Sequence, residues 1–309
     1  MRIAYDHSAV RVPATSANLG PGFDALGVAL GLHDDVRLDA TAGNAVVEVV
    51  GEGADTVERG EDNLIVRTVR YVLDEVGAPQ IGMRLHCENR IPHGRGLGSS
   101  ASAIVAGMLL ARALVSEPEL ITPELLIEWG SRIEGHPDNI APAVLGGATV
   151  GWVEGERGRA IRIGDAAALT PIAFIPSFRL STSKARGALP TDVLHGDAAA
   201  NAGRAALLTA ILAGVRVGAG VNAHEALMAA TEDRLHQEAR RDSMPSSLAL
   251  VDWLRDAGIA TVISGAGPTV LALEDIPQKY RAEAATRGWK VLPLPVDTDG
   301  AHNVPVAPR

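Results

Sequence analysis

The sequence contains one cysteine, Cys87, among 309 residues. A single thiol excludes an intrachain disulfide and a structural zinc site built from cysteines. The chain also lacks an apolar run long enough to span a membrane, and it reaches Asp6 before the core of a signal peptide could form. These absences predict a cytoplasmic protein that works in a reducing environment and has no membrane partner.

Aromatic residues make up only 3% of the chain, whereas hydrophobic residues make up 47%. The core must therefore be built mainly from Ala, Val, Leu and Ile. Basic residues are also outnumbered, because 28 Lys and Arg face 37 Asp and Glu and leave a formal net charge of −9. This balance argues against a nucleic-acid partner, since binding to a phosphate backbone depends on clustered positive charge.

The length of 309 residues exceeds the usual size of a single core, so we expect two domains, at residues 1–165 and 166–309. In the first, apolar patterns predict strands at 25–32 and 35–40, and a helix at 62–77 with Asp62 or Asn63 as N-cap. In the second, the pattern predicts helices at about 197–213, 224–241 and 246–257 and a β-hairpin at 260–273. This order is typical of an α+β sandwich with an antiparallel sheet.

A glycine- and serine-rich turn, PHGRGLGSSAS at residues 92–102, separates a predicted strand from a predicted helix. Glycines at 94, 96 and 98 allow positive φ and a close approach to a ligand, and Ser99 and Ser100 add hydroxyl groups for a phosphate or a metal ion. The turn is not a Walker A loop, because it lacks the Gly-Lys-Ser/Thr ending and Arg95 comes too early. It predicts an anion site at the start of the helix, although tight packing alone would also favour small residues here.

Three further polar, glycine-bearing stretches lie at the edges of predicted elements. They are PATSANLGPGFD at residues 13–24, GHPDNIAP at 135–142 and SGAGPT at 264–269. Three of these stretches resemble the three ordered motifs of the GHMP small-molecule kinases. We call residues 13–24 the first motif, residues 92–101 the second and residues 264–269 the third. Within that family, the first motif and the 135–142 stretch resemble the members that phosphorylate homoserine. The resemblance runs from about residue 10 to about residue 275.

The resemblance implies a two-domain fold, with an N-terminal nucleotide-binding α/β domain like ribosomal protein S5 domain 2 and a C-terminal ferredoxin-like α+β sandwich. It implies ATP-dependent phosphorylation of the L-homoserine hydroxyl to O-phospho-L-homoserine, a step toward threonine, with Mg²⁺ as the metal and Ser100 and Glu134 as its ligands. A homodimer is compatible with it. The implied nucleotide-binding residues are Asn63, Pro92, His93, Gly94, Arg95, Gly96, Leu97, Gly98, Ser99, Ser100, Ala101 and Ser102.

By the same resemblance, the substrate residues are Asn18, Asp24, His136, Asn139, Arg186 and Arg240. Asp24 is suited to the substrate ammonium, and two guanidinium groups would bind its carboxylate bidentately. Arg241 is an alternative to Arg240, and a simple helix cap is an alternative role for Asn63. Catalysis would involve Asn139, Arg186 and Thr182. Several relatives use an Asp base beside a Lys, but the corresponding stretch here holds Thr182 and Ser183, which favours direct transfer of the hydroxyl proton to the phosphate or to water.

Other functions remain as alternatives at this point. A different GHMP kinase would act on a mevalonate- or isoprenoid-type alcohol or on a sugar, and such a substrate without an amine does not need an acid such as Asp24. A non-catalytic nucleotide-binding homologue would keep the fold without the reaction. A serine hydrolase is disfavoured, because the sequence around Ser99 and Ser100 does not form a G-x-S-x-G elbow.

Overall fold

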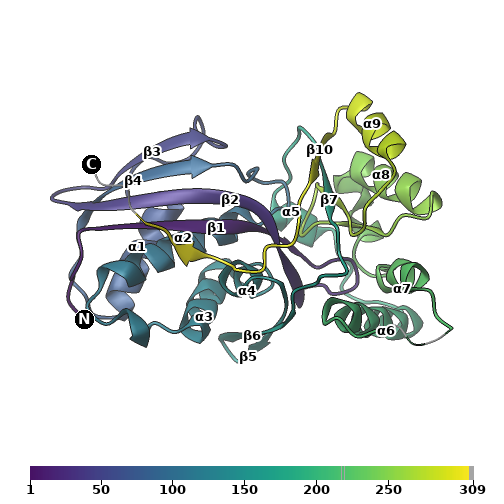
Figure 1. The fold of residues 1–309 in the computed structure, drawn as a ribbon, viewed down its shortest axis with the longest axis horizontal. Coiled ribbons are helices and arrows are strands. Elements are labelled where there is room, and N and C mark those ends of the chain that lie inside the picture. Colours follow the sequence, from purple (N-terminus) through teal and green to yellow (C-terminus); the bar gives the residue numbers. More distant parts are fainter. Residues whose placement is uncertain (217, 219, 306–309) are drawn as a thin grey trace.

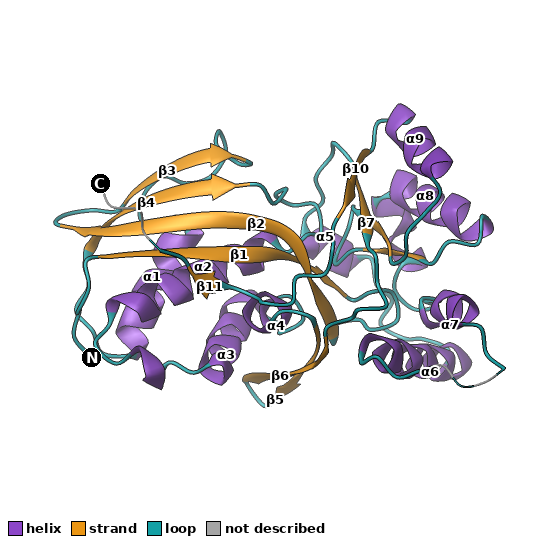
Figure 2. Ribbon diagram, viewed as in Figure 1, coloured by secondary structure: helices purple, strands orange, loops and turns teal. Residues whose placement is uncertain are grey.

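The protein is represented by a computed structural model that describes residues 1–216, 218 and 220–305. Two β-sheets with separate groups of helices make up the fold (Figures 1 and 2). The division of the chain at residue 165 into two domains stays a prediction. The candidate active site described below contains residues from both groups of elements.

The first sheet has the strand order β11-β1-β2-β4-β3, and a hairpin of β5 and β6 extends it from β2. Among the described strands of this sheet, β3 and β4 are the pair that runs parallel. Its strands are β1 (His7–Ala17), β2 (Leu26–Thr41), β3 (Val46–Gly51), β4 (Gly82–Asn89), β5 (Ala148–Glu154), β6 (Arg157–Gly164) and β11 (His302–Asn303). The helices that accompany this sheet are α1 (Leu64–Glu75), α2 (Ser99–Leu114), the 3₁₀ helix η1 (Pro118–Leu120), α3 (Pro123–Glu134) and α4 (Ile140–Leu145).

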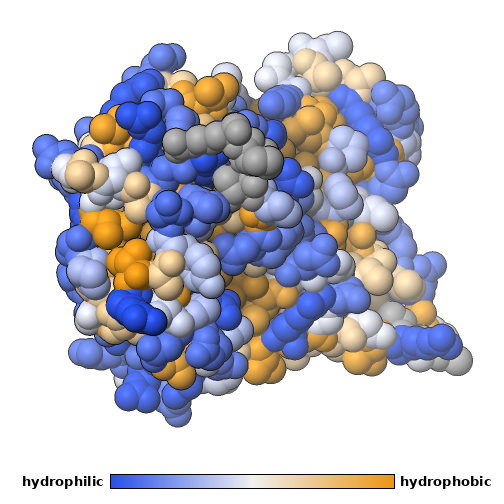
Figure 3. Space-filling view, turned by 60° about the vertical axis from the view of Figure 1, so that its left-hand side comes forward, coloured by the Kyte–Doolittle hydropathy of each residue, from blue (hydrophilic) through white to orange (hydrophobic). Residues whose placement is uncertain are grey.

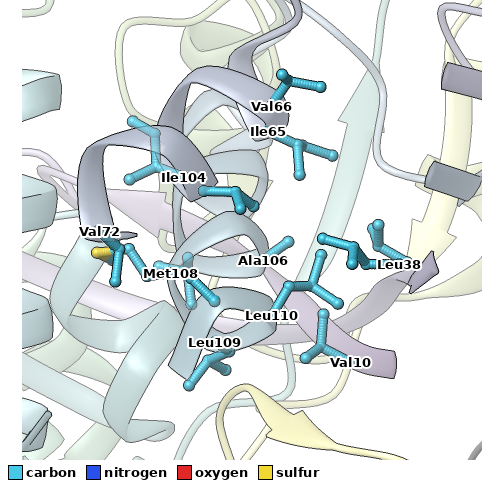
Figure 4. Packing of buried hydrophobic residues seen from close by; sticks show 14 of the residues in the cluster. Val10, Leu38, Ile65, Val66, Val72, Ile104, Ala106, Met108, Leu109 and Leu110 are labelled. Carbon is cyan, nitrogen blue, oxygen red and sulfur yellow. The ribbon is translucent and has the colours of Figure 1, made fainter. Parts of the chain in front are cut away.

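The core between this sheet and its helices is aliphatic, as the composition predicts. Helix α2 is buried over most of its length and lies between α1 and β1, so apolar residues occupy nearly all of its faces. The close view in Figure 4 shows this packing, with Val10, Leu38, Ile65, Val66, Val72, Ile104, Ala106, Met108, Leu109 and Leu110. Each fully buried Leu or Ile contributes about 2 kcal/mol. This packing fixes the start of α2, which borders the candidate site.

The second sheet has the order β10-β7-β9-β8, and all of its pairs are antiparallel, as expected. Its strands are β7 (Ile172–Ile175), β8 (Thr261–Ile263), β9 (Val270–Ala272) and β10 (Lys290–Pro293). The helices of this part are α5 (Thr182–Gly187), α6 (His195–Leu212), α7 (Ala223–Ala230), the 3₁₀ helix η2 (Glu238–Ser243), α8 (Pro245–Asp256) and α9 (Gln278–Thr286). After β10 the chain returns to the first sheet, where β11 pairs with β1.

Two elements differ from their sequence predictions. The strands predicted at 25–32 and 35–40 form one continuous strand, β2, which passes Gly31 through an irregularity opposite Pro13 and Ala14. The helix predicted at 224–241 ends instead at Ala230, because the carboxylate of Asp233 accepts hydrogen bonds from the backbone N–H groups that follow it. The resulting turn places Arg240 in the candidate site.

No helix in the described part of the chain is long and apolar enough to cross a membrane. On the face shown in Figure 3, hydrophilic side chains separate the apolar patches. The large hydrophobic residues with the greatest exposure are scattered, with Leu194 at 75% and Val50 at 70% on different parts of the fold. Neither residue is among those that line the two cavities of the site described next.

Candidate active site

The second motif forms a loop, residues 92–98, between β4 and α2, which we call the glycine loop. Its three glycines have positive φ, at 63° for Gly94, 75° for Gly96 and 69° for Gly98. Helix α2 begins directly afterwards at Ser99, and its N-cap residue, Gly98, has no side chain to cap the first turn. The backbone N–H groups of that turn can therefore bind an anion, as the sequence predicts.

Two of these glycines also have no room for a side chain. A Cβ atom on Gly96 would lie 2.3 Å from the carbonyl oxygen of Ser264, and one on Gly98 would lie 1.9 Å from Thr15 Oγ1. On Gly94 the nearest atom would be 3.6 Å away, on the side chain of Arg179. The glycine loop therefore serves tight packing as well as an open helix start.

The three motifs form one hydrogen-bonded assembly. In the first motif, the backbone N–H of Thr15 donates to the carbonyl of Leu97 at 3.1 Å. In the third motif, Ser264 Oγ donates to the carbonyl of Gly96 at 2.6 Å, and it is also hydrogen-bonded to the hydroxyl of Ser16 at 2.8 Å. The third motif therefore packs against the glycine loop and fixes its backbone.

A cavity of about 370 Å³ lies on one side of the glycine loop, among residues of β2, β4, α1 and α2. Asn63 lines it and also caps α1, because its Oδ1 accepts a hydrogen bond from the N–H of Ile65 at 2.9 Å. Its Nδ2 donates to the carbonyl of Glu58 at 2.8 Å. The cap predicted from sequence is confirmed, and the same residue faces the cavity. Other predicted nucleotide-binding residues in this lining are His93, Ser99, Ser100 and Ser102.

The same cavity contains a buried carboxylate, Asp34, which is 7% exposed. Its Oδ1 accepts hydrogen bonds from the backbone N–H groups of Arg90 at 2.6 Å and Ile91 at 2.9 Å, at the entrance to the glycine loop. Burial raises the pKa of Asp34 to about 6, although these N–H groups oppose the shift. The folded protein therefore binds a proton at Asp34 more tightly than the unfolded chain does.

Replacing Asp34 with Asn is expected to stabilise the protein at pH 8 and not at pH 4. The stability that comes from the raised pKa is fully present below the pKa of Asp34 in the unfolded chain, about 4, and is lost as the pH rises through about 6. At pH 8 the ionised carboxylate therefore costs up to about 3 kcal/mol of folding free energy. An Asn side chain keeps an oxygen for both N–H groups. Urea unfolding of the ligand-free protein at both pH values measures the difference.

The matched control is the neighbouring Asp35→Asn variant. In the wild type, the hydrogen bond from Arg11 to Asp35 is the main reason that the pKa of Asp35 lies below its usual range. This substitution should therefore lower the free energy of unfolding at pH 8. A gain in stability from Asp34→Asn that is equal at both pH values would contradict the assignment.

A second cavity, of about 150 Å³, lies on the other side of the glycine loop and shares Ser99 and Ser100 with the first. The structure brings most of the predicted substrate residues to this one place. Its lining includes Asn18, Glu134, His136, Asn139, Thr182, Arg186 and Arg240. Asp24 reaches the site through its contact with Arg186.

Ser100 and Glu134 meet at the junction of the two cavities. Ser100 Oγ donates to Glu134 Oε2 at 2.7 Å. Burial raises the pKa of Glu134, and the hydrogen bond from Ser100 opposes this effect. No group of three or more His, Cys, Asp or Glu side chains among the described residues is placed to hold a metal ion. The two hard oxygens fit Mg²⁺ when phosphate groups and water supply its other ligands, which is a common arrangement.

Asn139 is the N-cap residue of α4, His136 lies in the loop before it, and both line the second cavity. His136 Nδ1 is hydrogen-bonded to the buried carboxylate of Asp138. Burial lowers the pKa of His136, but the hydrogen bond and charge of Asp138 outweigh burial and raise it above its usual value. Asn139 Oδ1 accepts a hydrogen bond from Thr15 Oγ1 at 2.7 Å. Its orientation is therefore set by the first motif.

The carboxylate of Asp24 and the guanidinium of Arg186 form a bidentate ion pair across the site. Arg186 Nη2 donates to Asp24 Oδ1 at 2.6 Å, and Nη1 donates to Oδ2 at 3.0 Å. Asp24 has a positive φ of 57°, and its backbone N–H donates to Asn18 Oδ1 at 2.9 Å. The family resemblance implied that these two residues bind opposite charges of one substrate, and in this structure each neutralises the other.

The structure distinguishes between the two candidate arginines of η2. Arg240 is 2% exposed, lines the second cavity and donates from Nη1 to the carbonyl of Gly265 at 3.2 Å. Arg241 points to the surface, where it forms ion pairs with Glu238 at 2.7 Å and Asp252 at 2.9 Å. Only Arg240 is placed to contact a ligand in the second cavity.

Some predicted nucleotide-binding residues face away from both cavities. Arg95 donates through its guanidinium to the carbonyls of Pro176 and Ser177, each at 2.9 Å, and so ties the glycine loop to the end of β7. Leu97 and Ala101 are fully buried in the core, and Pro92 is also buried. The side chains of these four residues support the loop, whereas its backbone can still contact a nucleotide.

Sequence reasoning missed three residues of the site. Asp138 lies between two predicted residues and is paired with His136, and Thr15 orients Asn139. Phe23 lines the second cavity beside Asp24. All three belong to stretches that the sequence singled out, but their contacts depend on segments far apart in the chain. The residue types alone did not indicate that these three side chains belong to the site.

Comparisons with known proteins agree with this geometry. The model of the GHMP kinases N terminal domain matches residues 63–147, and that of the GHMP kinases C terminal matches residues 210–290. The chain is 49% identical over 300 residues to a homoserine kinase of Streptomyces avermitilis, covering 96% of both proteins. It is 43% identical to a homoserine kinase of Clavibacter michiganensis subsp. michiganensis, covering 94% of this chain and 92% of the relative.

Solved structures show the same fold. A homoserine kinase from Cytophaga hutchinsonii superposes with a TM-score of 0.81 at 24% identity, covering 97% of this chain and 98% of the other. The mevalonate kinase of Methanococcus jannaschii superposes with a TM-score of 0.65 at 13% identity, covering 94% and 98%. From the family models and the near full-length relatives together, the chain belongs to the GHMP kinase family and, within it, groups with the homoserine kinases.

Proposed function

We propose that this protein is an ATP-dependent kinase that phosphorylates the hydroxyl of L-homoserine to give O-phospho-L-homoserine, a step toward threonine. The observation that carries the proposal is the Asp24–Arg186 ion pair beside Asn139 and the glycine loop. The carboxylate of Asp24 and the guanidinium of Arg186, beside a small cavity, match the ammonium and the carboxylate of an amino acid. The open helix start matches a phosphate.

The nucleotide would occupy the larger cavity, with its base near Asn63 and its phosphates on the glycine loop and the first turn of α2. Ser100 and Glu134 would hold Mg²⁺ between the two cavities, with no other protein ligand required. Bound there, the ion would neutralise charge on the β- and γ-phosphate oxygens. The backbone N–H groups would then orient the γ-phosphate toward the second cavity.

The amino acid would bind by opening the resting ion pair. Its ammonium would take the place of Arg186 on Asp24, and its carboxylate would bind Arg186 and Arg240. Asp24 and Arg186 have side chains that are each 39% exposed in the ion pair. Because the zwitterion replaces each charge with a like charge, both would keep a partner when the substrate covers them. This exchange would favour a substrate that carries both charges over an alcohol that carries only one.

Phosphoryl transfer would proceed by direct attack of the hydroxyl, oriented by Asn139. The raised pKa of His136 favours its protonated form, which suits it to stabilise phosphate charge and makes it a poor base. We therefore propose that the hydroxyl proton passes to the phosphate or to water. Thr182 and Arg186 would assist through position and charge, since both line the cavity.

A coupled ADP-release assay tests the function with L-homoserine, mevalonate, L-threonine and the amine-free analogue 4-hydroxybutyrate. We expect turnover with L-homoserine and a loss of at least about 100-fold in kcat/KM with 4-hydroxybutyrate, the cost of about 2.7 kcal/mol of binding at Asp24. Turnover with mevalonate but not homoserine would support a different GHMP kinase. ATP binding without transfer to any of these alcohols would support a non-catalytic homologue.

A further inference from the structure

The aromatic ring of Phe23 lies between a histidine and two arginines. It stacks on the imidazole of His236 with the ring centres 4.2 Å apart and the planes within 6° of parallel. The guanidinium carbons of Arg186 and Arg240 lie 5.4 Å and 5.6 Å from the centre of the same ring. Phe23 thus contacts both arginines proposed to bind the substrate carboxylate.

His236 is held in this stack by a buried carboxylate. Its Nδ1 donates to Asp233 Oδ1 at 3.0 Å, and the side chain of Asp233 is fully buried. Burial raises the pKa of Asp233, but the hydrogen bond and charge of His236, with backbone N–H groups, outweigh burial and lower it. Asp233 is therefore an ionised group that fixes both the turn after α7 and the plane of the imidazole.

Asn201 of α6 joins the two segments that carry the stacked rings. Its Nδ2 donates to the carbonyl of Pro21 at 3.2 Å, and its Oδ1 accepts from the N–H of Arg234 at 3.0 Å. The side chain is buried, since the residue is only 4% exposed. Because one amide holds both backbones, the positions of Phe23 and His236 are set before any ligand binds.

Arg240 is fixed by the same turn. Its Nε donates to the carbonyl of His236 at 3.0 Å, and burial lowers its pKa. Two guanidinium groups close together repel each other, and Arg186 itself lowers the pKa of Arg240. The electron-rich face of an aromatic ring reduces this cost, and its effect increases when the cations are desolvated.

We propose that Asp233 and His236 are positioning residues that hold the Phe23 ring beneath Arg186 and Arg240, so that the carboxylate subsite for the amino acid is preformed. The inference rests on the proposed function, because it concerns the binding of that same substrate. His236 acts through Phe23 and is not among the residues that line the second cavity. Its loss should therefore weaken amino-acid binding at both arginines and leave the ATP side unchanged. The chemical step should change little, because the charge of Arg186 remains in the site.

The test compares His236→Ala and His236→Phe with the wild type by steady-state kinetics for both substrates. We expect His236→Ala to raise KM for L-homoserine about 10-fold, with KM for ATP and kcat changed less than about 3-fold. His236→Phe keeps an aromatic stack without the Nδ1 donor, and it should restore KM for L-homoserine to within about 3-fold of wild type. An unchanged KM for ATP also reports that each variant is folded.

A matched control is His224→Ala. His224 is an exposed histidine of α7 and is paired with Glu274. This variant should leave both KM values unchanged. The proposal is overturned if His236→Ala has a wild-type KM for L-homoserine, if both KM values rise together, or if His236→Phe is as impaired as His236→Ala. A wild-type enzyme that does not phosphorylate L-homoserine would instead overturn the proposed function, and this inference would fall with it.

Discussion

Replacing Gly98 with Ala is expected to reduce kcat/KM for L-homoserine at least about 100-fold, equivalent to about 2.7 kcal/mol of transition-state stabilisation. Gly98 has a φ of 69°, and a Cβ atom there would lie 1.9 Å from Thr15 Oγ1 and 3.2 Å from Asn139 Oδ1. The new methyl group must displace either the glycine loop or Thr15. Either movement disturbs the hydrogen bond that orients Asn139.

Gly94→Ala separates the steric effect from backbone strain. Gly94 has a similar φ of 63°, but its Cβ atom would come no closer than 3.6 Å to Arg179. Both variants bear the cost of a left-handed alanine, about 1 kcal/mol, and only Gly98→Ala adds a clash. Gly94→Ala should therefore lose less than about 10-fold in kcat/KM. Equal losses in the coupled assay would show that strain alone accounts for the effect.

A second variant tests the contact itself. Thr15→Ala removes the Oγ1 atom that the new methyl group would meet, while the Thr15 Cβ lies 3.1 Å from its position. The double variant Thr15→Ala/Gly98→Ala should therefore be more thermally stable than Gly98→Ala. Its activity should remain low, because Asn139 loses the donor that orients it. Thermal melting and the coupled assay together distinguish these effects.

The sequence predicted best where local chemistry decides the backbone. The cap of α1 at Asn63 and the positive φ of the three loop glycines follow from residue type and spacing, and both are confirmed. These features do not need information from distant parts of the chain.

The prediction was wrong, or incomplete, where distant groups or competing side chains decide. The helix predicted across residues 224–241 is broken because Asp233 binds the backbone N–H groups of the turn and the imidazole of His236. The pairing of Asp24 with Arg186 joins the first motif to α5. The Asp24–Arg186 contact cannot be read from spacing, because it depends on how the two sheets place their connecting segments. The Asp233–His236 contact is local, at a spacing of three residues, and the helical pattern of the stretch did not reveal it.

Glu134→Gln is expected to lower kcat at least about 1000-fold, or about 4 kcal/mol, if Glu134 and Ser100 hold the divalent ion. Gln keeps the length of the side chain and an oxygen that can accept the hydrogen bond from Ser100, which is 2.7 Å long in the wild type. It removes the negative charge that Mg²⁺ requires. The apparent Mg²⁺ concentration for half-maximal rate should therefore rise, as a titration at saturating ATP and L-homoserine would measure.

The pH profile gives this prediction a second and independent measurement. Burial raises the pKa of Glu134 in the metal-free protein, so protons should compete with Mg²⁺ for this carboxylate, and the Mg²⁺ concentration that the wild type needs should rise as the pH falls. This dependence of the Mg²⁺ requirement on pH should be absent from Glu134→Gln. Glu128→Gln is the control, because Glu128 lies on the same helix, pairs with Arg132 at 3.1 Å and gives the same change in net charge. If Glu128→Gln depends on Mg²⁺ as the wild type does and Glu134→Gln does not, the effect belongs to the carboxylate at the junction of the two cavities.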